Sequence, residues 1–321
     1  MSTNAIQSSH IYSTYFAPRG RSRIYTLGMQ IAQLYLSPFD QIIGFIGEAG
    51  SGKSVLIKGM FPGIELTNDD DGVNVRPLPL LEQEYETGFF TPHTYHLDIR
   101  FETGFHQLSE LADAVRLAVR RGKRIIIEHF DLIYPLLGVN ANLLIGVGEQ
   151  IVITRPNLFG PLPQELCDIV YPSLAYRLMA HSAEDLCEYA MTQEQMLACS
   201  HGDIRHGFVL EFNEHQPDID IPALEARVNE LIRADLPIDY YDESHILLGG
   251  VQHYCTGPRT HVRSTGRNSA SGCSTILSTT TFTRPICWSA ASETTPKKIS
   301  GSLKKSTAEV LGYAAHLHTW L

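Results

Sequence analysis

The 321-residue sequence contains no long uninterrupted apolar run. Because a transmembrane helix needs about 20 consecutive apolar residues, the sequence predicts no membrane span. Residues 1–10 are polar and lack the apolar centre of a signal peptide, so we expect a cytoplasmic protein. The six cysteines show no paired C-x-x-C spacing, which argues against a disulfide framework and against a zinc ribbon.

Positive charge is also scarce. The formal net charge is -10, whereas a non-specific nucleic-acid binder needs a basic surface. Local contact with an RNA end is still allowed. From residue 267 onward the composition changes, with six Lys or Arg, two Asp or Glu and 18 Ser or Thr. We expect this stretch either to be disordered or to result from a shift of reading frame near Gly266.

The sequence does contain a complete P-loop pattern, G-x-x-x-x-G-K-[ST]. Its residues are Gly47, Glu48, Ala49, Gly50, Ser51, Gly52, Lys53 and Ser54. An apolar run of strand type precedes the pattern at residues 41–46, and residues 55–60 continue it as a helix would. This context favours a phosphate-binding loop over a chance glycine-rich turn.

The residue types of the motif suit a nucleoside triphosphate, ATP or GTP, together with Mg²⁺. Small residues let backbone N–H groups approach phosphate oxygens, and the N-terminus of the following helix adds about half a positive charge. Lys53 would reach the β- and γ-phosphates, and the Ser54 hydroxyl would bind Mg²⁺.

Two stretches offer the carboxylate that such a site needs. The apolar strand at 123–131 ends in Glu128, our first choice, and Asp131, our second, as a Walker B element does. Asp131 could instead cap the next helix. An Asp-rich loop at 68–72 follows a predicted strand at 63–67 and could hold a catalytic base, although such turns are usually only solvated.

Strands and helices alternate from Gln41 to Pro156, which predicts an α/β fold with a doubly wound parallel sheet and helices on both faces. An amphipathic helix over residues 24–36 is expected to pack beside the first strand. We divide the chain into a lead-in and helix (1–40), a P-loop domain (41–156), a linker (157–175), a second domain (176–266) and a tail (267–321).

Four segments of the second domain follow one another in the order of a known family. They read R-L-M-A-H-S-A-E-D-L at 177–186, R-H-G-F-V-L-E-F at 205–212, L-E-A-R-V-N-E-L-I at 224–232 and C-T-G-P-R-T-H-V-R-S-T-G at 255–266. This stretch resembles the second additional domain of alanyl-tRNA synthetase. The resemblance implies an α+β editing-type fold, which that family shares with threonyl-tRNA synthetases and free-standing alanyl-tRNA editing proteins.

The resemblance also implies a Zn²⁺ site near the ester of a mischarged tRNA. Carried over position by position, its ligands would be His181, Asp185, Cys255 and His261. Asp185 stands where the family has a histidine, and two additional residues lie between Cys255 and His261. Since carboxylate is also a competent zinc ligand, the alternatives are a metal site and an emptied site kept as scaffold.

Together these features favour a P-loop kinase or NTPase in which Lys53, Glu128 and Asp131 carry the chemistry. Its second domain would recognise, and with metal deacylate, aminoacyl-tRNA or the tRNA 3′ end. One alternative is a small-molecule kinase with a non-catalytic second domain. Another is a nucleotide-gated tRNA-binding module without chemistry. Class II aminoacylation motifs are absent from the sequence, so a complete synthetase is not expected, and no signal indicates an oligomeric state.

Overall fold

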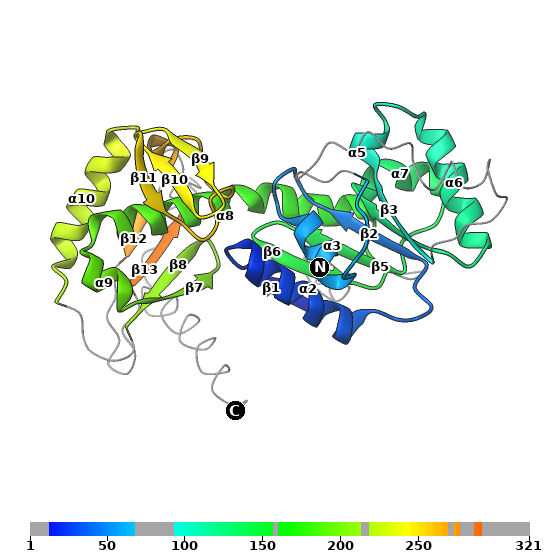
Figure 1. Cartoon of the computed structure of the whole chain (residues 1–321), viewed down its shortest axis with the longest axis horizontal. Helices are drawn as coiled ribbons and strands as arrows, with labels where there is room; N and C mark the ends of the chain where they lie inside the picture. The colour runs from blue at the N-terminus through cyan, green and yellow to red at the C-terminus, as the bar shows by residue number, and fades with distance from the viewer. Residues whose placement is uncertain are drawn as a thin grey trace, which may run out of the picture. The chain divides into compact units, whose positions relative to one another are not determined.

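A computed structural model describes residues 13–67, 93–156, 160–212 and 218–268, together with the backbone of 273–276 and 286–290 (Figure 1). The elements up to residue 156 are β1 (Ser13–Phe16), α2 (Arg21–Tyr35), β2 (Ile42–Ile46), α3 (Lys53–Met60), β3 (Thr94–Asp98), α5 (Ile99–Glu102), α6 (Leu108–Arg120), β4 (Arg124–Glu128), α7 (Phe130–Leu137), β5 (Leu143–Val147) and β6 (Gln150–Thr154).

The later elements begin with a long helix, α8. They are α8 (Pro163–Ala190), α9 (Gln193–Leu197), β7 (Ser200–Ile204), β8 (Gly207–Glu211), α10 (Ile221–Arg233), β9 (Ile238–Asp242), β10 (His245–Leu248), β11 (Val251–Tyr254), the 3-10 helix η1 (Thr265–Asn268), β12 (Cys273–Ile276) and β13 (Ile286–Ala290). Among the described helices, none is both long and apolar enough to cross a membrane.

The first region is built on a six-stranded sheet in the order β1-β6-β5-β2-β4-β3. Strands β5, β2, β4 and β3 are parallel, whereas β6 runs antiparallel to β5 and β1 antiparallel to β6. The α/β class is confirmed, but the prediction of a wholly parallel sheet is wrong. Only Gly148 and Glu149 separate β5 from β6, and so short a connection allows a hairpin but no parallel crossover.

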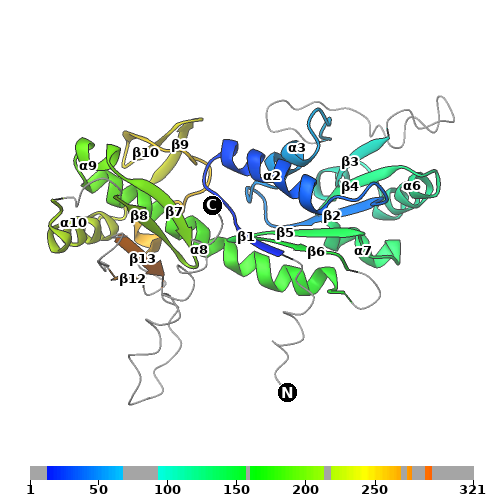
Figure 2. The ribbon, with the colours of Figure 1, turned by 90° about the horizontal axis from the view of Figure 1, so that it is seen from below.

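Helices cover both faces of this sheet, because the buried strands alternate their side chains between the two sides. Ile42 and Ile46 of β2 belong to a core cluster with α6, α7 and α8, whereas Ile43 and Phe45 belong to a second cluster with α2 and α3. Figure 2 shows α2 and α3 on one side of the sheet and α7 and α8 on the other.

Glycines allow α2 and α3 to approach closely. A Cβ atom on Gly28 would lie 2.5 Å from the Leu56 carbonyl oxygen, and one on Gly59 would lie 2.2 Å from the Tyr25 carbonyl oxygen. Only glycine fits at such distances. This contact fixes α3, whose first residue is the P-loop lysine, against its neighbouring helix.

Two local predictions differ from the structure. Residues 63–67 form no strand, because the backbone of Thr67 is bound by a side chain of β3 instead of a neighbouring strand. The predicted helix at 24–36 is α2, which begins three residues earlier. The Asp-rich loop at 68–72 lies outside the described residues, as does most of the predicted tail.

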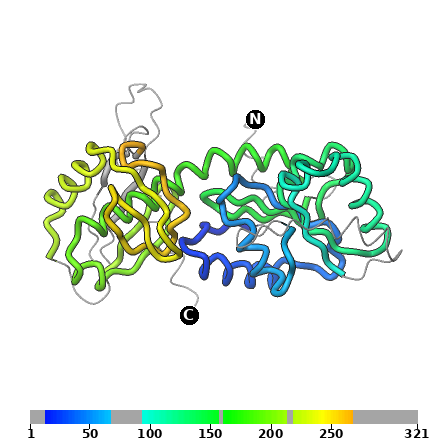
Figure 3. Tube along the Cα trace, turned by 45° about the horizontal axis from the view of Figure 1, so that its top comes forward, coloured from blue at the N-terminus to red at the C-terminus, as the bar shows by residue number. Residues whose placement is uncertain are grey.

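The 28-residue helix α8 contributes to two hydrophobic cores. Leu166 and Val170 pack in the cluster of the six-stranded sheet, while Ala183 and Leu186 pack with β8 and α10. Figure 3 traces α8 as one continuous helix. Residues 163–175, at the end of the predicted linker, are therefore helical.

The region after α8 mixes helices with antiparallel strands. Strands β11, β10 and β9 form a three-stranded sheet in that order, and β12, β13, β8 and β7 form a four-stranded sheet. Two short segments of the predicted tail thus supply strands, β12 and β13. Helix α10 packs Leu224, Val228 and Ile232 into the core of this region.

Candidate functional site

The P-loop connects β2 to α3, and Lys53 folds back over it. The Lys53 Nζ atom donates hydrogen bonds to the carbonyl oxygens of Gly47, at 3.1 Å, and Glu48, at 3.0 Å. Gly50 and Gly52 have φ angles of 78° and 95°, in the left-handed region that favours glycine. The glycines of the motif are therefore explained by the conformation of the loop.

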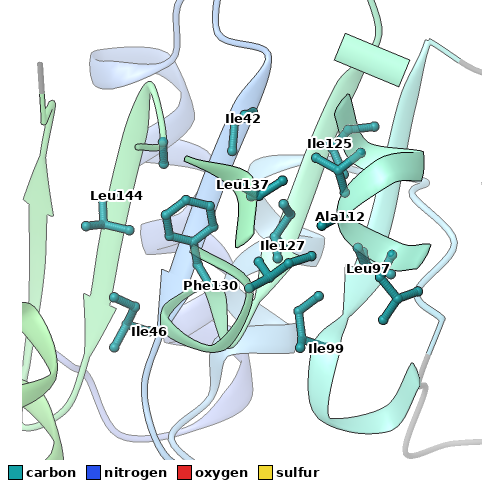
Figure 4. Packing of buried hydrophobic residues seen from close by; sticks show 14 of the residues in the cluster. Ile42, Ile46, Leu97, Ile99, Ala112, Ile125, Ile127, Phe130, Leu137 and Leu144 are labelled. Atoms are coloured by element: carbon teal, nitrogen blue, oxygen red, sulfur yellow. The ribbon is translucent and has the colours of Figure 1, made fainter. Parts of the chain in front are cut away.

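Glu128 lies at the end of β4, directly beside this loop. Ile125 and Ile127 of β4 are buried, and Phe130 of α7 packs on the same face of the sheet (Figure 4). The Ser54 hydroxyl donates to Glu128 Oε1 at 3.0 Å, and Lys53 Nζ lies 3.7 Å from Glu128 Oε2. The predicted pairing of the P-loop with a carboxylate at the end of a buried strand is present.

His96 of β3 also contacts this carboxylate, and the sequence did not predict it. The backbone N–H of Thr67 donates to His96 Nδ1 at 3.1 Å, so Nδ1 is the acceptor nitrogen of the ring. The proton of a neutral imidazole is then on Nε2, which donates to Glu128 Oε1 at 3.2 Å. His96 therefore helps to hold Glu128 in one orientation.

The surroundings of Glu128 favour its ionised form. Burial alone would raise its pKa, but the hydrogen bond from His96, the charge of Lys53 and the hydrogen bond from Ser54 outweigh burial and lower the pKa to about 2. Burial lowers the pKa of Lys53, and the charge of Glu128 opposes this shift. The buried pair thus consists of a carboxylate and an amine that stabilise each other's charge.

Asp98 is the second carboxylate at this edge of the sheet. It ends β3 and pairs in register with Glu128, which ends the neighbouring parallel strand β4. Potential ligand atoms of Asp98, Glu128 and His129 all lie within 4.8 Å of one another. The sequence did not single out Asp98, because its place at the edge of the sheet depends on where β3 ends.

Asp131 does not join this group of described residues. It lies in the first turn of α7, where burial raises its pKa. His129 lies between the strand and this helix with a φ angle of 57°, and burial together with the charges of Lys53 and Arg100 lowers its pKa to about 4. Asp98 therefore replaces Asp131 as the partner of Glu128.

Three of the four predicted zinc ligands converge. Potential ligand atoms of Asp185, Cys255 and His261 lie within 4.8 Å of one another, with 2.5 Å between Asp185 Oδ2 and His261 Nε2. The Cys255 Sγ atom lies 3.7 Å from the same His261 nitrogen. The α8 side chain and the loop after β11 thus meet as the resemblance implied.

His181 belongs to none of the convergent groups of described residues. Its Nδ1 atom lies 2.9 Å from the Thr260 hydroxyl, which donates its own proton to the Gly257 carbonyl oxygen at 2.8 Å. The hydroxyl therefore accepts from Nδ1. Burial lowers the pKa of His181 well below its usual value, so the ring is neutral. The expectation of four convergent ligands is met by three.

Arg19 enters this cluster, and no local sequence signal indicated it. Its Nη1 atom donates to Glu184 Oε2 at 2.5 Å, and its Nη2 atom donates to Asp185 and, at 3.0 Å, to Cys255 Sγ. Burial alone would lower the pKa of Arg19, but Asp185 and Glu184 raise it well above the usual value. With this guanidinium between Asp185 and Cys255, the donor set does not fit a zinc ion.

Arg177 of α8 contacts the P-loop itself. Its Nη1 atom donates to the Ser51 carbonyl oxygen at 2.8 Å, and its Nη2 atom donates to the Pro18 carbonyl oxygen at 3.2 Å. The side chain is buried, and burial lowers its pKa to about 10. Arg177 therefore binds both the P-loop and the segment that carries Arg19.

The ion pairs of Glu128 predict a specific pH dependence. Its folded-state pKa lies below the ordinary value, so its stabilising effect is complete above pH 5 and is lost as the pH falls toward 2. In Glu128→Gln this contribution is absent at every pH. Between pH 5 and pH 3 the wild type should lose about 2 kcal/mol more unfolding free energy than the variant.

Urea unfolding followed by circular dichroism at the two pH values measures this difference. The control is Glu230→Gln, which changes an exposed glutamate of α10 and should follow the wild type. Parallel curves for wild type and Glu128→Gln would contradict the ion-pair assignment.

No protein-family model matches the chain, and no curated protein matches it in sequence. The functional assignment therefore rests on the motif and on the contacts of the residues described above.

Proposed function

We propose that the chain binds a Mg²⁺–nucleoside triphosphate, ATP or GTP, at residues 47–54 and transfers or hydrolyses the γ-phosphoryl group. The observation that carries this proposal is the contact of the half-buried Ser54 and the buried Lys53 with the buried Glu128, at the carboxyl ends of the parallel strands β2 and β4. Open α/β sheets bind ligands at this edge.

The loop has the groups that a polyphosphate requires. The amine of Lys53 is bound to two backbone carbonyl oxygens of the loop, which a more negative phosphate oxygen can replace. A Cβ atom at Gly50 would meet nothing within 4 Å, so the backbone there is open to a ligand. The first turn of α3 adds N–H groups without intrahelical partners.

The oxygen donors beside the loop suit Mg²⁺, which prefers hydroxyl, carboxylate and water ligands. Ser54 and Glu128 are the side chains that would hold it, directly or through water. Bound Mg²⁺ supplies neutralisation of phosphate charge. The low pKa of Glu128 keeps this residue ionised for that role at neutral pH.

Asp98 is the side chain best placed to orient the attacking hydroxyl or water and to accept its proton. It lies beside Glu128, but the two carboxylates have different partners. Glu128 binds Ser54 and His96, whereas Asp98 accepts a hydrogen bond from the Phe101 N–H at 3.2 Å. Separate surroundings allow one carboxylate to hold the metal and the other to act on the nucleophile.

Lys53→Ala should weaken binding of ATP and GTP by about 100-fold, because it removes a charged hydrogen-bond donor to phosphate. Isothermal titration with each nucleotide, with and without Mg²⁺, measures the loss. The control is Lys58→Ala, in the last turn of the same helix. Unchanged affinity in Lys53→Ala would place the phosphates elsewhere and exclude the proposed site.

Asp98→Asn should lower kcat for phosphoryl transfer or hydrolysis by about 100-fold and leave nucleotide affinity nearly unchanged, because a catalytic base contributes to the transition state. Phosphate release and nucleotide titration on the same sample separate the two effects. Asp113→Asn, at an exposed aspartate of α6, is the control. A loss of affinity equal to the loss of kcat would assign Asp98 to binding alone.

A second candidate function is nucleotide-gated recognition of aminoacyl-tRNA or the tRNA 3′ end. The contact between Arg177 and the Ser51 carbonyl oxygen favours it, because this hydrogen bond connects the loop that would bind phosphate to α8. A simple small-molecule kinase has no need of this link.

Under this second function, tRNA affinity should change several-fold when nucleotide is added, since coupling free energies are typically about 1–3 kcal/mol. Filter binding of tRNA and aminoacyl-tRNA at fixed salt, with and without ATP or GTP, measures the change. Lys53→Ala should bind tRNA but lose the effect of nucleotide. The absence of tRNA binding in every condition would exclude this function and leave the first one standing.

A further inference from the structure

We propose that the guanidinium group of Arg19 is the permanent cation of the Asp185–Cys255–His261 cluster, so that this cluster works without a metal ion. The inference concerns the region after α8 and does not depend on the P-loop activity. Arg19 occupies the position at which the resemblance implied a zinc ion.

The N–H groups of Arg19 bind two of the expected zinc ligands, Asp185 and Cys255. One terminal nitrogen binds Glu184, and the other binds both Asp185 and Cys255 Sγ. Zinc lies about 2.0–2.3 Å from its ligands, which surround it as a tetrahedron. A guanidinium and a metal ion cannot both occupy the space between Asp185 and Cys255, and their like charges would repel each other.

The two buried carboxylates beside Arg19 share its positive charge. Arg19 is 4% exposed, Glu184 3% and Asp185 2%, so the arginine and the two carboxylates lie together out of solvent. An uncompensated buried carboxylate would cost several kcal/mol, which is the usual reason for a cation at such a place. Here a residue of the chain supplies that cation, and its planar fork satisfies two acids at once.

The backbone near Arg19 is shaped for this contact. A Cβ atom on Gly20 would lie 2.8 Å from the Thr256 carbonyl oxygen, and one on Gly257 would lie 3.0 Å from Arg19 Cγ. Glycine at both positions lets the two segments approach each other. The carbonyl oxygen of Pro18, the preceding residue, is bound by Arg177, which fixes the direction from which Arg19 enters.

The remaining side chains agree with a metal-free cluster. His181 donates to Thr260, and the backbone N–H of Gly257 donates to Cys255 Sγ at 3.3 Å. His261 binds Asp185. The thiol and the carboxylate therefore have partners from this chain, and Arg19 connects them.

The test compares the metal content of the full-length wild type with that of Arg19→Ala. The wild type should contain no stoichiometric Zn²⁺ by plasma mass spectrometry and should show no thiolate-to-cobalt absorption on titration with Co²⁺. Arg19→Ala should bind a Zn²⁺ or Co²⁺ ion in the space left by the guanidinium. Adding Cys255→Ser to Arg19→Ala should remove the cobalt–thiolate absorption.

Arg23→Ala, at an exposed arginine of α2, is the matched control and should behave as the wild type. Stoichiometric metal in the wild type would overturn the proposal, as would a folded Arg19→Ala that binds no metal. The wild type also decides independently: chelator should leave its melting temperature unchanged, and a fall would overturn the proposal.

Discussion

Three positively charged side chains, Lys53, Arg19 and Arg177, lie almost entirely out of solvent. A buried ion is tolerated only when charges and hydrogen bonds of the surrounding protein replace water. Each of these cations meets that requirement in a different way. Lys53 uses loop carbonyls and Glu128, and Arg19 uses two carboxylates and a thiol. Arg177 uses mainly backbone carbonyl oxygens, together with the charge of Asp203.

These differences suggest different roles for the three cations. The carbonyl oxygens around Lys53 are weak partners that an anionic ligand can displace, so this charge is available for binding. The partners of Arg19 are full negative charges at close range, so this charge is committed to structure. Arg177 donates to backbone carbonyl oxygens and also interacts with the charge of Asp203, and it joins the P-loop to the segment before Arg19.

Local motifs predicted a substantial part of the molecule. The P-loop, the strand that ends in Glu128 and the helix α2 follow from short-range patterns that depend on only a few neighbouring residues. Contacts between distant segments were harder to predict. Asp98 meets Glu128 only through strand register, and Arg19 reaches Asp185 across 166 positions.

The wrong or incomplete predictions have the same origin. Asp131 was expected near the metal because it closely follows Glu128 in the chain, yet it interacts with Tyr171 of α8 and does not join the Asp98–Glu128 group. His181 was assigned by resemblance, but a hydroxyl from the loop at 257–260 binds its Nδ1 atom. In both cases the neighbour that decides the role of the residue comes from another element.

Helix α8 gives one apolar face near Leu166 to the first core and another near Leu186 to the second. Cutting the chain between these positions would leave each fragment with a truncated helix and an exposed apolar surface. Such a surface promotes aggregation. The two cores therefore share helix α8 as a common element. Shuffling of either half into another protein would require that the helix be carried along.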